Sequence, residues 1–292
     1  MNPRSESVRP SIAWSRDGFN VEERSSRGKL PDVHPILVEF GPLTIRWYGV
    51  FVALGFLLAF AMFRARAARL NLEEEVSTNL ALLLFVAGLV GARAWYVVRY
   101  WREEFADHLR EIVMIQHGGL VFLGGFFVAM LVLWTWCRVK KLPLATMADA
   151  LAPPLALGHA FGRIGCFMNG CCHGRPSDAF WAIAPNAPPQ FAGVRLHPTQ
   201  LYEAAGLLDI VAALLVLQRV QRYPGQLAWS YAILYSVLRF VVEFFRGDVP
   251  HEILGRFTSA QAACALLFLV AWLGSARAAY RAARACRAVR GG

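Results

Sequence analysis

Residues 78–98 read TNLALLLFVAGLVGARAWYVV, and this stretch decides the fold class. It is apolar without interruption from Leu80 to Ala92, and it does not alternate polar and apolar residues as a half-buried strand would. Its length matches the roughly 20 residues that a helix needs to cross a hydrocarbon core of ~30 Å. The stretch therefore predicts a transmembrane helix.

Six further apolar stretches share this pattern. With the first they form seven predicted spans, at Trp47–Phe63, Thr78–Val98, Leu120–Cys137, Met147–Phe167, Gln200–Leu217, Gln226–Phe245 and Ser259–Ala276. The whole chain is 57% hydrophobic and only 17% charged, whereas a soluble domain is about 25% charged. We therefore expect an all-α integral membrane protein with about seven transmembrane helices.

Basic residues follow every second predicted span. They are Arg64, Arg66 and Arg69, then Arg138, Lys140 and Lys141, then Arg219 and Arg222, and finally Arg277, Arg281, Arg284, Arg287 and Arg290. Cytoplasmic loops are enriched in Lys and Arg, so the N-terminus is predicted outside and the C-terminus in the cytoplasm. The net charge of +10 is thus explained by topology, and no nucleic-acid partner is expected.

The two ends of the chain differ from the spans. Residues 1–33 are polar and lack the apolar core of a signal peptide, so we expect a disordered extension before a transmembrane domain at 34–276. Residues 277–292 are predicted to be a basic cytoplasmic tail. This tail is interpreted either as a short helix touching anionic lipid headgroups or as a plain positive-inside anchor.

Ionisable residues inside spans indicate function, because burying them in hydrocarbon is costly unless they face a polar cavity. Arg93 follows two small residues, with snorkelling to the interface as the alternative. Arg163 lies in a glycine-rich stretch, four residues after His159 and therefore on the same helical face. Tyr235, Arg239 and Glu243 form one stripe, for which a structural Arg239–Glu243 pair is the alternative.

A polar motif, His197-Pro198-Thr199-Gln200-Leu201-Tyr202-Glu203, opens the fifth span. Helix capping with an interfacial tyrosine would explain it without any other role. Taken together, two arginines on different helices point to an anionic partner inside the bundle, because guanidinium groups suit a phosphate diester.

The cysteines near Arg163 raise the question of a metal. Cys166, Cys171, Cys172 and His173 could supply soft ligands, but no CxxC pair occurs and adjacent cysteines rarely reach one ion. We expect packing residues first, a disulfide second, and no metal. No phosphate-binding glycine loop or dinucleotide motif is present, so no cofactor is expected.

Four motifs together resemble one known family over residues 34–276. They are His34-Pro35-Ile36-Leu37 through Gly49, Gly-Arg-Ile-Gly at Gly162, His-Pro-Thr-Gln-Leu-Tyr-Glu at His197 and Arg-Phe-Val-Val-Glu-Phe-Phe-Arg at Arg239. In this order and at these distances the chain resembles bacterial phosphatidylglycerol–prolipoprotein diacylglyceryl transferases.

The resemblance implies a multi-pass enzyme of the bacterial inner membrane. It would move a diacylglyceryl group from phosphatidylglycerol to the lipobox cysteine of a prolipoprotein signal peptide, among membrane lipids, and release glycerol phosphate. By resemblance Arg163, Arg239 and Gly174 bind the lipid, and Tyr48 and Tyr235 match site tyrosines. Glu243 and Arg246 match ion-pair positions, with His197, Gln200 and Arg93 in support.

The sequence departs from the family pattern at polar positions. The family's proposed base is a histidine in Gly-Gly-x-x-Phe-His-Gly-Gly, where this chain has Leu123. An asparagine and a glutamate of the family are Cys166 and Cys171 here. A substitute base is predicted among His117, His159, His173 and His197, with His117 preferred. The alternatives are transfer to another acceptor on the same scaffold, and a non-catalytic lipid-binding protein.

Overall fold

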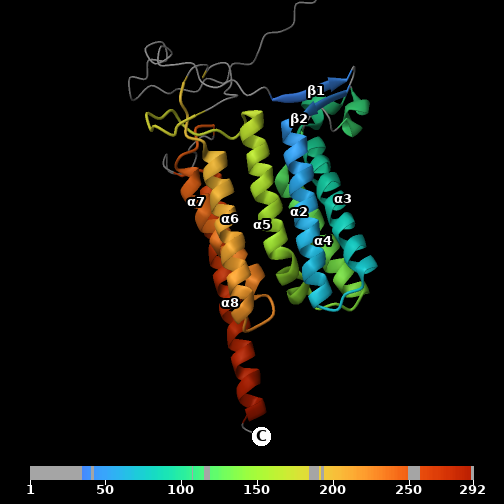
Figure 1. Cartoon of the computed structure of the whole chain (residues 1–292). Coiled ribbons are helices and arrows are strands. Elements are labelled where there is room, and N and C mark those ends of the chain that lie inside the picture. Colours follow the sequence, from blue (N-terminus) through green and yellow to red (C-terminus); the bar gives the residue numbers. More distant parts are fainter. Residues whose placement is uncertain are drawn as a thin grey trace, which may run out of the picture.

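The computed structural model describes residues 35–40, 43–106, 108–114, 119–183, 191, 194–248 and 257–290. Long helices make up most of this part (Figure 1). They are α2 (Trp47–Arg69), α3 (Glu74–Arg99), α4 (Phe122–Val139), α5 (Leu144–Asn169), α6 (Thr199–Leu217), α7 (Gln226–Glu243) and α8 (Ser259–Arg290). The predicted extension at residues 1–33 and the preferred base His117 lie outside the described residues.

Five of these helices are long and apolar enough to cross a membrane: α2, α3, α4, α6 and α8. Their apolar windows are only 11% to 39% buried inside the protein, which leaves many hydrophobic side chains to face lipid. The helices α5 and α7 are not among these five. The protein is a helical membrane protein, and the count of seven spans stays a prediction.

The helix α5 lies between two groups of helices (Figure 1). It packs most extensively against α2 on one side and α6 on the other, while α3 packs on α4 and α7 on α8. Glycine permits the close approach of α3 and α4, since a Cβ at Gly91 would lie 2.7 Å from the carbonyl oxygen of Gly124. The central position of α5 brings its polar residues into contact with several other helices.

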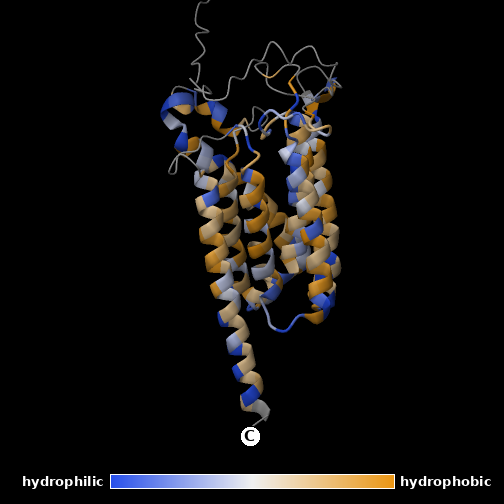
Figure 2. Ribbon diagram, turned by 90° about the vertical axis from the view of Figure 1, so that its left-hand side faces the viewer, coloured by the Kyte–Doolittle hydropathy of each residue, from blue (hydrophilic) through white to orange (hydrophobic). Residues whose placement is uncertain are grey.

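The loops that were predicted to be cytoplasmic all lie at one end of the bundle, together with the C-terminal part of α8 (Figure 1). Figure 2 shows hydrophobic residues along the middle of the helices and hydrophilic ones at this end. The opposite end carries the antiparallel strands β1 (Ile36–Phe40) and β2 (Leu43–Arg46). It also carries the π-helix η1 (Trp101–Phe105) and the 3-10 helix η2 (Leu109–Val113).

Two features differ from the sequence-based expectation. The hairpin of β1 and β2 was not predicted, because strands of five and four residues are too short to show a period. The basic residues after 276 do not form a separate helix, since α8 continues without a break to Arg290. The short 3-10 helix η5 (Gln218–Val220) extends α6 at the end that carries the basic loops.

Candidate functional site

A buried carboxylate, Glu203, lies at the centre of a polar cluster formed by α5, α6 and α7. One of its oxygens, Oε1, is 3.0 Å from Arg163 Nη2 and accepts a hydrogen bond of 3.2 Å from the Tyr235 hydroxyl. The other, Oε2, is 3.8 Å from Arg239 Nη1. Glu203 therefore bridges two arginines that come from helices on either side of it. We call Glu203, Arg163, Arg239, Glu243, His159 and Tyr235 the Glu203 cluster.

Arg239 makes a second, closer ion pair in the same cluster. Its Nη2 is 2.7 Å from Glu243 Oε2, one helical turn away, so the predicted stripe on α7 does contain this pair. Glu243 in turn accepts a hydrogen bond of 2.8 Å from the Thr258 hydroxyl, just before α8. The cluster thus balances two arginines with two carboxylates, which removes the cost of an unpaired charge inside the bundle.

The arginines are accessible, whereas the carboxylates are not. The side chains of Arg163 and Arg239 are 16% and 14% exposed, and those of Glu203 and Glu243 are each 1% exposed. Arg239 Nη1 is itself buried and makes no hydrogen bond among the residues that the structure describes, with Glu203 Oε2 at 3.8 Å. A ligand that reaches the cluster would therefore meet guanidinium donors first, and the arrangement suits an anion.

His159 lies inside this cluster rather than at its edge. Its Nε2 accepts a hydrogen bond of 3.4 Å from Arg163 Nε and is 3.8 Å from Glu203 Oε1. A nitrogen that accepts from an arginine must carry a lone pair, so the imidazole is neutral with its proton on Nδ1. The ring stacks on that of Phe122, with centroids 6.0 Å apart, and packs against Tyr235 at 5.1 Å.

The loop after α5 is joined by backbone hydrogen bonds to the motif at His197 and to the motif at Arg239. The amide of Gly174 donates to the His197 carbonyl at 3.0 Å, and that of Arg175 donates to the Phe245 carbonyl at 2.9 Å. A Cβ at Gly174 would lie 2.5 Å from the His197 Cβ and 2.7 Å from the Phe245 carbonyl oxygen. Gly174 is therefore required for close packing of three segments that are distant in the sequence.

Two of the predicted supporting arginines have other partners. Arg246 makes a bidentate ion pair with Asp248, at 2.7 and 2.9 Å, and not with Glu243. Arg93 donates to backbone carbonyls around η2, including those of Ile112 at 3.0 Å and Gly119 at 3.1 Å. Arg93 thus anchors the segment between α3 and α4, and the structure places it apart from the Glu203 cluster.

The remaining predicted residues surround the Cys171–Cys172 segment and the start of α6. The Gln200 amide nitrogen donates to the Cys171 carbonyl at 2.7 Å. Tyr48, at the start of α2, lies against Gly165 and within electrostatic reach of Arg163. His197 Nδ1 is 3.0 Å from the Tyr202 hydroxyl. Burial and the charge of Arg175 lower the pKa of His197, which favours its neutral form.

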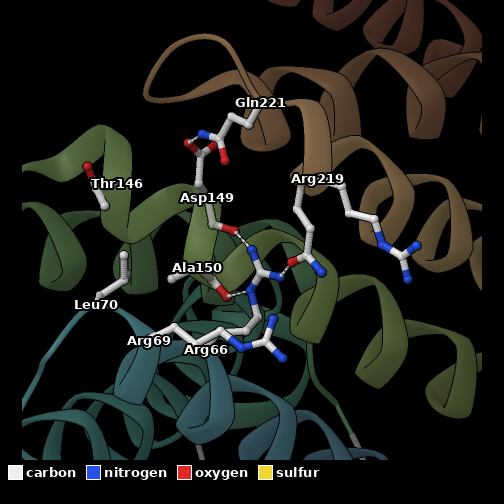
Figure 3. Close-up of a pocket in the computed structure, with 9 residues that line it drawn as sticks. Arg66, Arg69, Leu70, Thr146, Asp149, Ala150, Arg219 and Gln221 are labelled. Carbon is white, nitrogen blue, oxygen red and sulfur yellow. Dashed lines mark hydrogen bonds between the residues drawn. The ribbon is translucent and has the colours of Figure 1, made fainter.

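A second polar cluster lies near the opposite end of α5, around Asp149, and borders a cavity of about 560 Å³ (Figure 3). Asp149 Oδ2 accepts hydrogen bonds of 2.6 Å from both the Gly225 amide and Gln221, and Oδ1 accepts one of 2.9 Å from the Ala228 amide. A carboxylate on α5 therefore caps the N-terminus of α7. Arg66 donates to the carbonyls of Asp149 and Ala150 and to Gln218.

Comparison with known proteins identifies the family of this chain. The family profile for prolipoprotein diacylglyceryl transferase matches residues 35–276. The chain belongs to this family. A relative from Bordetella bronchiseptica is 36% identical over 230 residues, covering 77% of this chain and 86% of its own. Another, from Finegoldia magna, is 35% identical over 207 residues, covering 70% and 81%.

A third relative, from Parasynechococcus marenigrum, is 34% identical over 256 residues, which is 82% of this chain and 92% of its own. All three relatives are named phosphatidylglycerol–prolipoprotein diacylglyceryl transferase. The family predicted from the motifs is thereby confirmed.

The position of the expected family histidine is next in the sequence to a residue that contacts His159. Leu123, the residue found there, is 48% exposed near the start of α4. Its neighbour Phe122 is the residue that stacks on His159. An imidazole from α5 therefore reaches the region that borders Leu123.

Sequence reasoning named Glu203 only as part of a motif and did not select Asp149. One signal was present for both, since each is an acidic residue within the first two turns of an otherwise apolar helix. The sequence did not show which side chains or backbone groups each carboxylate would contact.

Proposed function

We propose that this chain transfers the diacylglyceryl group of phosphatidylglycerol to the lipobox cysteine thiol of prolipoprotein signal peptides in a bacterial inner membrane. The observation that carries the proposal is the convergence of Arg163 and Arg239 on Glu203 inside a helical membrane bundle. Two partly accessible guanidinium groups suit the phosphate of this lipid. The names of the relatives support the reaction.

The arginines would both bind the phosphate and stabilise the charge that develops on it. In this reaction the thiolate sulfur forms a bond to the lipid carbon next to the phosphate, and the carbon–oxygen bond breaks. The electron pair stays on the oxygen, so the phosphate gains one negative charge as glycerol phosphate leaves. Donors already held near that charge lower the barrier, and the partly exposed guanidinium groups of Arg163 and Arg239 would supply them.

The thiol proton needs an acceptor, and we assign it to His159. Its Nε2 lone pair accepts a hydrogen bond from Arg163 Nε. If Arg163 turns towards the phosphate, this lone pair becomes free to take the proton. Glu203, 3.8 Å away, would stabilise the imidazolium that forms. This assignment replaces the family histidine at the position of Leu123, and it is preferred over His117.

Rescue of a bacterium depleted of its own transferase tests the reaction. The wild-type chain is expected to restore growth and lipid-modified lipoproteins, and Arg239→Ala is expected to abolish both. Arg219→Ala, a change to an exposed arginine near the opposite end of the bundle, is the matched control and should rescue fully. Failure of a correctly inserted wild-type chain would reject the proposed reaction.

A non-catalytic lipid-binding role has one observation in its favour, the leucine at position 123. The two roles separate in an assay with labelled phosphatidylglycerol and a lipobox peptide. Transfer of label to the peptide cysteine, and its loss with a serine in that place, supports the transferase. Binding of the lipid without any transfer would favour the lipid-binding role.

A further inference from the structure

Three cysteine side chains converge at the end of α5 that carries Arg163. The Sγ atoms of Cys166, Cys171 and Cys172 all lie within 4.8 Å of one another, and the three thiols are free. The buried thiols of Cys137 and Cys264, by contrast, belong to no such group among the described residues. The convergence is therefore a local property of this loop.

Two residues with positive φ turn the backbone so that the three cysteine side chains come together. The helix α5 ends with Gly170 in the left-handed region at φ +73°, and Cys172 also has a positive φ of +63°. A residue with a Cβ adopts this conformation at a cost of about 1 kcal/mol or more. Such a conformation persists only where the surroundings impose it.

The start of α6 imposes this conformation. The Thr199 hydroxyl donates to the Cys172 carbonyl at 2.8 Å, and Gln200 Nε2 donates to the Cys171 carbonyl at 2.7 Å. The other atom of that amide, Gln200 Oε1, is buried without a hydrogen-bond partner in the described part of the chain. The loop is thus fixed from outside, and the thiols are held together before any ligand arrives.

Metals bind the thiolate form of cysteine, and two basic side chains lie near these sulfurs. The charges of Arg163 and Arg246 are both within electrostatic range of Cys172. The same arginines would offset the excess negative charge of three thiolates around a divalent ion. Because Cys166 follows Arg163 by less than one helical turn, such an ion would also fix the helix end that carries this arginine.

We propose that Cys166, Cys171 and Cys172 form a three-thiolate site for a soft or borderline d10 cation such as Zn²⁺. Sulfurs that bind one zinc ion at ~2.3 Å in tetrahedral geometry lie about 3.8 Å apart, which the observed limit of 4.8 Å accommodates. Three protein ligands leave a fourth position for water or an external thiol. Sequence spacing argued against a metal, and the fold supplies the proximity that spacing did not show.

The test uses the full chain, reduced and stripped of metal by a chelator, in detergent micelles. Co²⁺ serves as the spectroscopic probe, and Zn²⁺ uptake is measured by elemental analysis after gel filtration. We expect one metal ion per chain and a sulfur-to-cobalt charge-transfer band that Zn²⁺ abolishes. Cys171→Ser should lose the band and the bound metal. The matched control, Cys137→Ser with Cys264→Ser and Cys286→Ser, should keep both.

A second measurement does not depend on the folding of a variant. In the wild-type chain, Zn²⁺ should protect Cys166, Cys171 and Cys172 from alkylation, as followed by mass spectrometry, while the exposed Cys286 stays reactive. No metal uptake by the reduced wild-type chain would overturn the proposal. So would uptake that Cys171→Ser leaves unchanged in a protein that elutes as the wild type does, or alkylation that Zn²⁺ does not slow.

Discussion

Two of the buried carboxylates, Asp149 and Glu203, lie near opposite ends of α5, and their surroundings differ in kind. Asp149 accepts hydrogen bonds from two backbone amides and one glutamine side chain, and Arg66 beside it donates to backbone carbonyls. Glu203 contacts only side chains, namely two arginines, a tyrosine and a histidine. Fourteen residues of helix, about 20 Å, separate Asp149 from Arg163.

The difference shows which buried charges hold the bundle together and which are available for a ligand. Backbone partners cannot move without moving a helix, so the polar atoms around Asp149 are committed to the fold. Side chains can turn, and at Glu203 an arginine nitrogen still has no acceptor in the described structure. A cavity of about 560 Å³ borders Asp149, yet the chemistry of the groups there is that of a helix cap.

The largest effect is expected from Arg239→Lys. The three donors of an ammonium project from one nitrogen, so they cannot replace the planar guanidinium, whose separate nitrogens reach Glu203, Glu243 and a ligand. We expect diacylglyceryl transfer to fall by about 100-fold or more, with normal insertion in the membrane. Labelled phosphatidylglycerol and a lipobox peptide measure the rate, and Arg69→Lys near Asp149 is the control. Near-normal transfer by the lysine variant would show that the Glu203 cluster, like the one around Asp149, is not needed for the reaction.

His159→Gln should have the next largest effect, because glutamine preserves hydrogen bonding but cannot take a proton at neutral pH. We expect kcat to fall by roughly 100-fold with little change in the KM for the lipid. Adding Leu123→His to this variant should recover part of the lost rate, since position 123 adjoins the Phe122 contact. An unchanged kcat in His159→Gln would show that the proton goes elsewhere.

Asp149→Asn should have the opposite effect to these two variants: it should lower the stability of the fold and leave the transfer rate unchanged. Asparagine has one acceptor oxygen where the carboxylate uses two, so a buried amide N–H loses its partner at a cost of about 2 kcal/mol. Chemical unfolding in detergent measures this loss, and Asp209→Asn, an exposed change on α6, is the control. Transfer per folded molecule should stay normal, and a selective loss of transfer would assign Asp149 to the site instead.

The smallest effect concerns pH and the loops above the Glu203 cluster. Trp181 Nε1 donates to the Tyr202 hydroxyl at 2.7 Å. That hydroxyl lies 3.0 Å from His197 Nδ1 and can donate to it when this nitrogen is unprotonated. Because the pKa of His197 is lowered in the folded state, its contribution to stability is complete above about pH 6.5 and decreases as the pH falls below that value. His197→Gln should flatten this part of the unfolding profile, and an equally steep profile would assign the effect to another group.

Several parts of the site were predictable because the signals are local. A polar residue within an apolar helix is visible in the sequence, and so Arg163, Arg239, Tyr235 and Glu243 were selected. Periodicity placed Arg239 and Glu243 on one face of a helix, and the ion pair between them, which was the alternative interpretation, spans one turn of that helix. Gly174 was selected by resemblance, but its physical reason, the approach of His197 and Phe245, needed the tertiary contacts.

The sequence by itself determined a helical membrane protein, the family to which it belongs, and the two arginines at its centre. These follow from composition, periodicity and short motifs, all of which act over a few residues. Only the tertiary structure decided that Glu203 joins those arginines, that His159 rather than Arg93 lies beside them, and that three cysteines meet. Each of these depends on which residues α5, α6 and the loop between them bring into contact. Helix periodicity defines the faces of one helix, but packing between distant segments decides which faces meet.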